Sequence, residues 1–344
     1  MELRYDKIVN IIDKTKAILV GDEITIDGFA QRKVRVITHV HSDHVGGLKD
    51  SIYYSNYIVA TPATHDLLVE LGYVGRNYSH LYKRKKVQLE YYVEKTFYNH
   101  AIQLIPSTHI LGSAQVRVSY NGYVIGYTSD FKMGDKTDVI KSPDILIIEA
   151  TYGSPGCRRP FKNDVIDLVL DVVIDGLRKY DKIIVYGYYG KLQEIMRILR
   201  EKGIREPFLM NKKIYAITKI AEKYGWSIGN YYNINTREAR EIMRSEKYLL
   251  FEHMVKAKYR RLDGRALNII LSGHEHSEPI KKIDEYTWLA AFSDHADFDE
   301  LIEYVEKSQP ELVIVDGSRE GYPYTFAKEL RKRGWNAIVL PEKK

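Results

Sequence analysis

Hydrophobic positions change their pattern twice along this chain. Up to residue 153, apolar runs of strand length alternate with polar turns, and Asn121-Gly122 between two such runs is typical of a tight hairpin. A helix is predicted to begin at Thr61-Pro62, where a capping residue precedes a proline. Strands are predicted over 17–20, 23–26, 34–38, 87–93, 101–105, 115–120, 123–128 and 145–148.

Between residues 154 and 284 the pattern alternates between helical and strand periods, which favours a parallel αβ unit. The segment 285–344 then returns to short strands and amphipathic helices, including a strand predicted over 288–292. The sequence therefore predicts an α/β protein. One αββα-type domain, residues 1–153 and 285–344, is interrupted by a second domain, residues 154–284.

The composition excludes several classes of protein. No apolar run approaches the roughly 20 residues that a membrane helix needs, and the first six residues lack the order of a signal peptide. Cys157 is the one cysteine, which excludes an internal disulfide and a zinc site built from cysteines. We therefore expect a soluble, cytoplasmic protein with no membrane partner.

The charge and the aromatic content fit a polyanionic partner. The formal net charge is +6, and the chain has 28 tyrosines. Tyrosine rings can stack on the bases of single-stranded nucleic acid without sequence preference, although most of these rings are expected in cores. The composition is compatible with nucleic acid but does not identify it.

Four residues with metal-binding side chains lie within the six-residue stretch His39-Val-His-Ser-Asp-His44, directly after an apolar strand. Side chains at positions i and i+2 of a strand end point the same way, so His39 and His41 can bind one ion. Asp43 and His44, displaced around the turn, can reach a second ion. Neutral imidazole and carboxylate ligands suit zinc, and this spacing predicts a two-metal site.

Two further donors, His109 and Asp130, also follow predicted strands. Strand ends are rigid positions at which ligands can be held. The donors are expected to form two shells that each leave room for water: His39, His41 and His109 on the first ion, Asp43 and His44 on the second, and Asp130 between them.

Five strings of the chain resemble the metallo-β-lactamase fold and its β-CASP nuclease branch. They are His39-Val-His-Ser-Asp-His44, Thr108-His-Ile-Leu-Gly-Ser113, Tyr127-Thr-Ser-Asp130, Glu149-Ala-Thr-Tyr-Gly153 and Phe292-Ser-Asp-His-Ala-Asp297. Shorter strings, including Gly190-Lys-Leu-Gln193, look most like ligase-associated DNA exonucleases, and archaeal members of the mRNA 3'-end processing type are also similar. The resemblance implies a metallo-β-lactamase sandwich with an inserted β-CASP domain, and two Zn²⁺ ions as cofactors.

The resemblance also implies roles for acidic and imidazole groups around the metals. Asp43, Glu149 and His295 are expected in catalysis, with His295 giving a proton to the leaving oxygen or holding the phosphate. Glu149 is expected to orient His295 or one of the zinc-binding histidines. Asp27 is a candidate support for a metal ligand, although a turn aspartate needs no such role.

One position departs from the pattern of the RNA-processing members. Those proteins carry a histidine for the second zinc in a Val-His-Gly string, where this chain has Val315-Asp316-Gly317. Asp316 could bind the metal through oxygen, or it could leave a weaker second site that exchanges with Mn²⁺. DNA-acting members also lack the histidine, so the departure favours DNA.

Candidate contacts to substrate lie mainly in the inserted segment. Gly190-Lys191 at a strand-to-helix turn could hold a phosphate, although a glycine turn needed only for packing is an equal alternative. His274 and Ser113 are further candidates. Two basic runs with tyrosine, Tyr82–Lys86 and Lys256–Arg261, could follow a nucleic-acid backbone, although such runs are more often simply solvated.

The sequence thus predicts a zinc-dependent phosphodiesterase that acts as an exonuclease on single-stranded DNA and that could form oligomers. The alternatives are an RNA 3'-end processing endo- or exoribonuclease of the same family, a catalytically weak nucleic-acid-binding subunit, and an ester or thioester hydrolase on the same fold. Polarity and the choice between endo and exo cleavage leave no trace in the sequence.

Overall fold

The computed structural model describes residues 5–134, 136–259 and 264–342, and the chain divides into two units. Unit 1 runs to Arg158 and resumes at His295, while unit 2 comprises Arg159–Asp294. Among the described residues, no helix has the length and apolar character needed to cross a membrane.

Unit 1 contains two sheets. The first has the strand order β1-β2-β3-β4-β5-β6, antiparallel up to β3 and parallel from β3 onward. Its strands are β1 (Val9–Ile12), β2 (Ala17–Val20), β3 (Ile24–Ile26), β4 (Val34–Val36), β5 (Tyr57–Ala60) and β6 (Lys86–Gln88).

The second sheet of unit 1 has the order β20-β19-β11-β10-β9-β8-β7. Its strands are β7 (Glu94–Phe97), β8 (His100–Pro106), β9 (Ala114–Tyr120), β10 (Tyr123–Tyr127), β11 (Ile145–Ile148), β19 (Leu312–Asp316) and β20 (Ala337–Leu340). Strands β9 and β10 form the predicted hairpin around Asn121-Gly122, in which both residues have positive φ angles, as a type I′ turn requires. Strands β10, β11, β19 and β20 are parallel.

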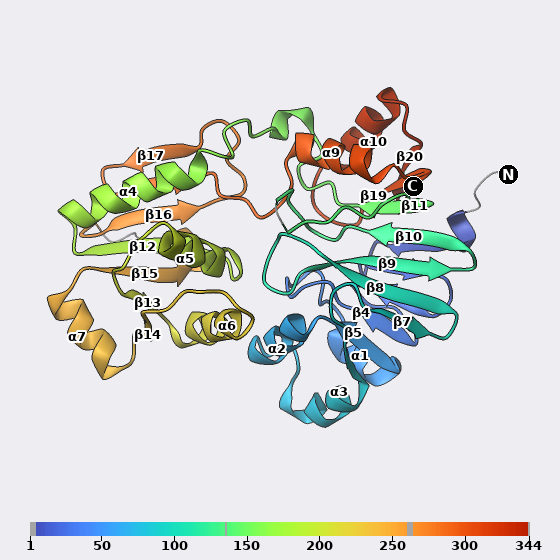
Figure 1. Cartoon of the computed structure of the whole chain (residues 1–344), viewed down its shortest axis with the longest axis horizontal. Helices are drawn as coiled ribbons and strands as arrows, with labels where there is room; N and C mark the ends of the chain where they lie inside the picture. Colours follow the sequence, from blue (N-terminus) through green and yellow to red (C-terminus); the bar gives the residue numbers. More distant parts are fainter. Residues whose placement is uncertain (1–4, 135, 260–263, 343–344) are drawn as a thin grey trace. The chain divides into compact units, whose positions relative to one another are not determined.

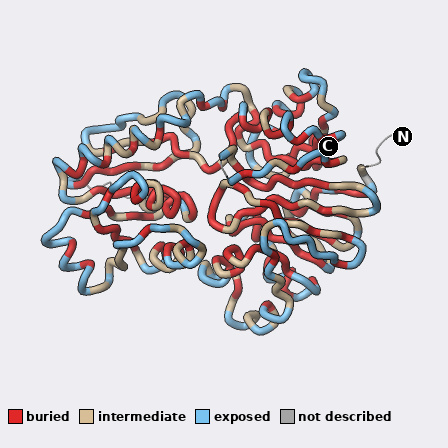
Figure 2. The backbone as a smooth tube through the Cα atoms, viewed as in Figure 1, coloured by how far each residue is buried: buried red, intermediate tan, exposed pale blue. Residues whose placement is uncertain are grey.

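One hydrophobic core joins the two sheets of unit 1. Ile26 and Val36 of the first sheet belong to the same buried cluster as Val116, Ile147 and Ile314 of the second. The strands of this unit are accordingly buried along most of their length (Figure 2). Burial of apolar side chains at about 25 cal/mol per Å² is the main force that holds the sheets together.

Helices lie on the outer sides of the two sheets (Figure 1). Near the first sheet lie α1 (Leu48–Tyr54), α2 (Pro62–Glu70) and α3 (Ser79–Lys85), and the second sheet packs on α9 (Phe298–Ser308) and α10 (Pro323–Lys332). Short 3-10 helices lie at Tyr5–Lys7, Arg76–Tyr78 and Pro155–Cys157. This helix-sheet-sheet-helix order confirms the predicted α/β fold.

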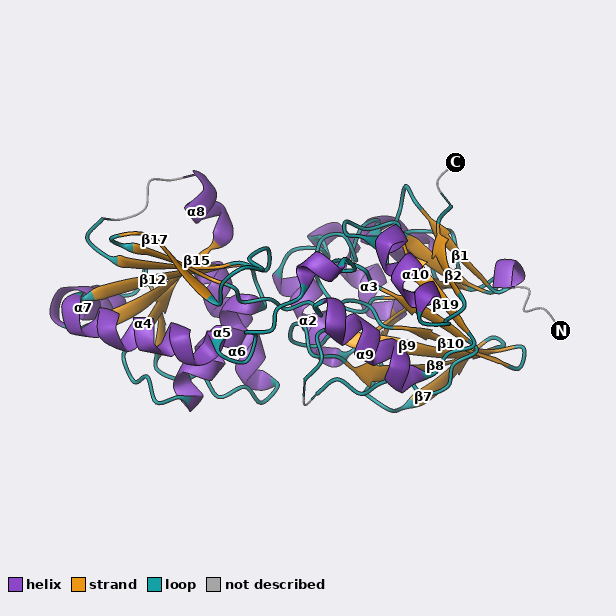
Figure 3. Cartoon of the chain, turned by 90° about the horizontal axis from the view of Figure 1, so that it is seen from above, coloured by secondary structure: helices purple, strands orange, loops and turns teal. Residues whose placement is uncertain are grey.

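Unit 2 is an αβ unit around one sheet of order β14-β13-β15-β12-β16-β18-β17. Its strands are β12 (Lys182–Gly187), β13 (Phe208–Met210), β14 (Tyr231–Asn233), β15 (Tyr248–His253), β16 (Leu267–Leu271), β17 (Ile280–Asp284) and β18 (Thr287–Ala290). All neighbours are parallel except β17 and β18. The helices are α4 (Val165–Lys179), which lies along the sheet (Figure 3), α5 (Lys191–Glu201), α6 (Lys212–Lys223), α7 (Arg237–Ser245) and α8 (Met254–Tyr259).

Among the details that differ from the sequence-based expectation, two concern the sheets. The strand predicted over 288–292 was assigned to the interrupted domain, but β18 pairs with β16 in the sheet of unit 2. An apolar run identifies a strand without identifying its neighbour. The strand predicted over 87–93 is also too long, because β6 ends at Gln88.

Candidate metal centre

Strand ends of both sheets of unit 1 bring the predicted donors together. The loop after β4 carries His39, His41 and His44, while His109 follows β8 and Asp130 follows β10. His39 and His44 are completely buried, and Asp130 is 5% exposed. Side chains that are separated by up to 91 positions in the chain therefore meet at one edge of the sandwich.

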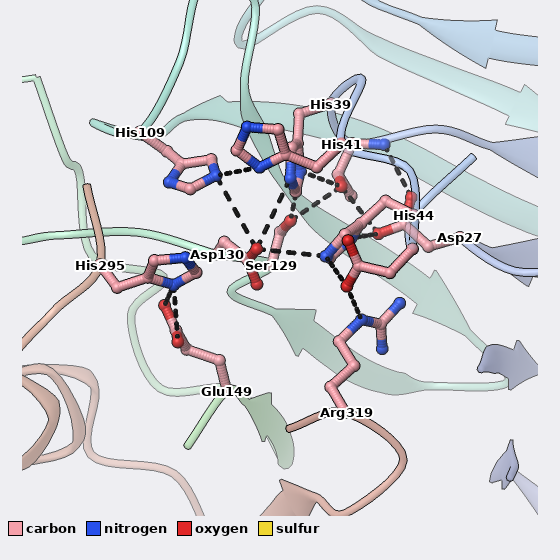
Figure 4. Close-up of polar contacts among 12 residues, drawn as sticks. Asp27, His39, His41, His44, His109, Ser129, Asp130, Glu149, His295 and Arg319 are labelled. Atoms are coloured by element: carbon pink, nitrogen blue, oxygen red, sulfur yellow. Dashed lines mark hydrogen bonds and ion pairs between the residues drawn. The ribbon is translucent and has the colours of Figure 1, made fainter. Parts of the chain in front are cut away.

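Four of these side chains form what we call the first cluster: His39, His41, His109 and Asp130. Their donor atoms all lie within 4.8 Å of one another, and Figure 4 shows the side chains pointing toward a common centre. Nδ1 of His41 lies 3.0 Å from Nε2 of His109, and Oδ2 of Asp130 lies 3.5 Å from Nε2 of His39. Three imidazoles and one carboxylate match the ligand set of zinc.

Asp43 and His44 form a second cluster with the shared carboxylate of Asp130. Nε2 of His44 lies 3.3 Å from Oδ2 of Asp43 and 3.2 Å from Oδ2 of Asp130. Within the described part of the chain, Nε2 of His39 and Nε2 of His44 are buried, and neither makes a well-aligned hydrogen bond beyond these contacts with carboxylate oxygens. Buried polar atoms are rarely left unsatisfied, and a bound cation would satisfy these two, so the donor set fits a metal centre.

Hydrogen bonds on the far side of the rings hold the histidines in place. Nδ1 of His44 lies 2.7 Å from Oδ2 of Asp27, which also accepts from the Thr38 hydroxyl. Nδ1 of His39 lies 3.1 Å from the same hydroxyl and 3.3 Å from the hydroxyl of Ser129. Such contacts fix the orientation of a metal-binding imidazole, so Asp27 is placed where it can orient His44.

Burial and neighbouring charges together set the protonation of two of the donors, His39 and Asp130. Burial, followed by the positive charges of the neighbouring histidines, lowers the pKa of His39 well below its usual value. For Asp130, burial alone would raise the pKa, but His44, His295 and His39 outweigh it and hold the pKa well below its usual value. A neutral imidazole and an ionised carboxylate are the forms that bind metal.

Arg35 is a buried residue that the sequence analysis did not identify. It is completely buried in β4, and its guanidinium donates to the carbonyl oxygens of His44 at 2.8 Å and Gly46 at 3.3 Å. Burial lowers its pKa to about 10, so the group stays charged at neutral pH. A charged residue between Val34 and Val36 was the available signal in the sequence.

We expect the substitution Arg35→Met to destabilise unit 1. Hydrogen bonds to charged groups contribute about 1.5 to 3 kcal/mol each, and methionine leaves both carbonyl oxygens without their donor. The free energy of unfolding, measured by urea titration, should fall by about 3 kcal/mol. The exposed Arg178→Met is the matched control. If the two variants had equal stability, the assigned role of Arg35 would be wrong.

The contact expected between Glu149 and His295 is present. Nδ1 of His295 lies 3.2 Å from Oε2 of Glu149, and Oε1 of Glu149 accepts from the backbone amide of Phe131 at 2.9 Å. The His295 ring lies 4.9 Å from that of His109, centroid to centroid, and its side chain is 20% exposed. An oriented imidazole with an accessible edge thus lies beside the first cluster (Figure 4).

Both carboxylate oxygens of Asp316 are engaged by neighbouring residues. Its Oδ1 accepts from the backbone amide of Ser318 at 2.9 Å and from the Ser318 hydroxyl at 2.6 Å, while Oδ2 pairs with Arg319. The expectation that Asp316 binds the second metal disagrees with this arrangement. The resemblance of Val315-Asp316-Gly317 to a family motif could not show that Arg319 would form an ion pair with Asp316.

The three residues predicted to contact the substrate differ in their burial and in their contacts. Ser113 is 1% exposed, and its hydroxyl accepts from the amide of Ile110 at 3.1 Å, so it closes a turn and does not present its oxygen to a substrate. In unit 2, Nζ of Lys191 lies 3.1 Å from Oδ1 of Asp294, and His274 is exposed. Of the two basic runs, Tyr82–Lys86 covers the end of α3 and the start of β6, whereas the second run ends outside the described residues.

The double sheet and the donor clusters define a metallo-hydrolase. Comparison with known families agrees, because residues 280–341 match the family described as "Zn-dependent metallo-hydrolase RNA specificity domain". A solved structure of a protein of unknown function from Enterococcus faecalis V583 superposes with a TM-score of 0.61 at 12% identity, covering 95% of this chain and 94% of the other. This likeness supports the fold.

Similar proteins identify the family within the metallo-hydrolases. "Uncharacterized protein in lig 3'region" of Acidianus ambivalens is 44% identical over 138 residues, 40% of this chain and 98% of that protein. "RNase J-like protein" of Methanocaldococcus jannaschii is 25% identical and covers 89% of this chain and 85% of its own length. "Probable DNA ligase" of Opitutus terrae is 25% identical over 92% of this chain but only 30% of its own length. The chain belongs to the β-CASP nucleases of the metallo-β-lactamase fold, a family of metal-dependent enzymes that cleave nucleic acid.

Proposed function

We propose that this enzyme binds two divalent ions, with zinc in the first cluster, and digests single-stranded DNA from or near an end. The observation that carries the proposal is the first cluster, in which four donor atoms within 4.8 Å of one another come from three strand ends. The second cluster would hold the other ion, zinc or the more exchangeable Mn²⁺. When bound, such ions supply an activated water and neutralise charge on the phosphate.

The protein groups around the clusters would divide the remaining work. His295 would donate a proton to the leaving oxygen, because its ring lies beside His109 and has an accessible edge. Glu149 would keep that ring oriented through Nδ1. Asp43 would act beside the second cluster, and contacts of Lys191 and His274 with the substrate remain predictions.

Two observations support DNA as the substrate. One relative is named "Uncharacterized protein in lig 3'region", and another, named "Probable DNA ligase", carries a segment similar to 92% of this chain. The histidine typical of RNA-processing members is replaced by Asp316, which pairs with Arg319. Single-stranded RNA is the second candidate, because the matched family is named for RNA specificity and one relative is named RNase J-like.

The substrate is tested with labelled oligonucleotides. Single-stranded DNA and RNA of the same sequence, labelled at either end, are incubated with the enzyme and Zn²⁺ or Mn²⁺. We expect DNA to be shortened progressively from one end and RNA to be cut more slowly. Faster cleavage of RNA than of DNA would contradict DNA as the substrate and would favour single-stranded RNA. Hydrolysis of a chromogenic thioester with both oligonucleotides left intact would contradict both.

A further inference from the structure

A fixed positive charge lies beside the second cluster. Nε of Arg319 lies 3.6 Å from Oδ2 of Asp43, the same oxygen that lies 3.3 Å from Nε2 of His44. Figure 4 shows the Arg319 side chain extending from its own loop toward His44. One carboxylate oxygen is therefore placed between the guanidinium and the position that the second ion would take.

Arg319 is held firmly in this place. Its side chain is 9% exposed and forms a buried ion pair with Asp316, while Nη2 donates to the backbone carbonyl of Lys16 at 3.3 Å. Nε is buried without a hydrogen-bond acceptor among the residues that the structure describes. Moving the guanidinium away from Asp43 would break a buried ion pair, which is strongly unfavourable.

The two clusters differ in the donors that they can offer. The first cluster has four donor residues, whereas the second has Asp43, His44 and a share of Asp130. Asp316, which could have added a carboxylate, has both oxygens engaged by Ser318 and Arg319. Because like charges repel over these distances, a guanidinium next to Asp43 opposes binding of a divalent cation there.

We propose that Arg319 lowers the affinity of the second cluster for its ion, so that the enzyme keeps the first ion tightly and exchanges the second. The arginine then provides a permanent positive charge beside the second cluster when only one ion is bound. This inference rests on the proposed function, in which the clusters are the metal site.

Calorimetric titration of the metal-free full chain with Mn²⁺ and Zn²⁺ tests the inference. The main variant combines Arg319→Met with Asp316→Asn, because removing both partners leaves no buried charge alone. Arg319→Gln is a second variant that removes the charge and retains a donor for Asp316. We expect both to tighten the second binding event by about 10- to 100-fold, the range over which groups next to metal ligands act. The first event should stay unchanged.

The controls separate the effect of charge from a loss of structure. Arg319→Lys keeps the positive charge and should titrate like the natural protein, as should the exposed Arg178→Met, and urea unfolding verifies that each variant is folded. An unchanged or weakened second event in the charge-removing variants would overturn the inference while leaving the metal site intact. If the natural protein bound no ion at all, the proposed function itself would be wrong.

Discussion

The Asp130→Asn variant should cleave nucleic acid far more slowly than the natural protein. Removal of a single electrostatic contact in an active site slows a reaction by about 10² to 10³-fold, and we expect the loss of rate here to be larger. The reason is that the Asp130 carboxylate is shared between the two clusters, with Oδ2 at 3.5 Å from His39 and 3.2 Å from His44. Asparagine keeps the shape of the side chain and removes its charge. Metal content by atomic emission and cleavage of labelled oligonucleotides are the two measurements.

The same substitution at Asp22, which is exposed in a turn of unit 1, is the matched control and should retain both metal and activity. Urea unfolding should show that Asp130→Asn is still folded, since the amide fits the same space. Normal turnover in the Asp130→Asn variant would refute the assignment of both clusters. Loss of turnover with metal content fully retained would refute the metal role of Asp130 alone.

Replacement of His295 by alanine should slow cleavage by roughly 10² to 10⁴-fold if the imidazole donates a proton to the leaving oxygen. Metal content should not change, because His295 lies beside the first cluster and pairs with Glu149. The loss should shrink greatly on a phosphodiester with a p-nitrophenyl leaving group, which departs without a proton. Glu149→Gln should show a smaller defect of about 10- to 100-fold.

The exposed His80→Ala provides the control for a histidine substitution in the same unit. Equal losses on natural and p-nitrophenyl substrates would mean that His295 acts by holding the phosphate or the structure, and would remove it as the proton donor. An unchanged rate on both substrates would remove it from the reaction altogether.

Parts of the site could be predicted from the sequence, because each of these donors lies in or directly after a short stretch that is typical of a strand end. The shared direction of His39 and His41 follows from strand geometry. His109 and Asp130 each follow a predicted strand, a rigid position at which a ligand can be held. The interruption by an αβ unit followed from the change of hydrophobic period. In each case the relevant signal lies within a few residues of the side chain that it concerns.

The supporting contacts depend on pairings that no local pattern contains. Glu149 meets His295 across 146 positions, and Arg35 reaches the loop after its own strand only because the chain turns back over it. Arg319 was missed, although it explains why Asp316 does not join the donors. The partner of β18 likewise depends on sheet order, which an isolated apolar run does not encode.

Anomalous X-ray diffraction at the zinc absorption edge, on crystals grown with Zn²⁺, tests the metal centre most directly. We expect a peak at about 2.0 to 2.1 Å from ring nitrogens of His39, His41 and His109, with a second, weaker peak next to His44 and Asp43. A map with no peak within bonding distance of these histidines would contradict the assignment of the metal centre.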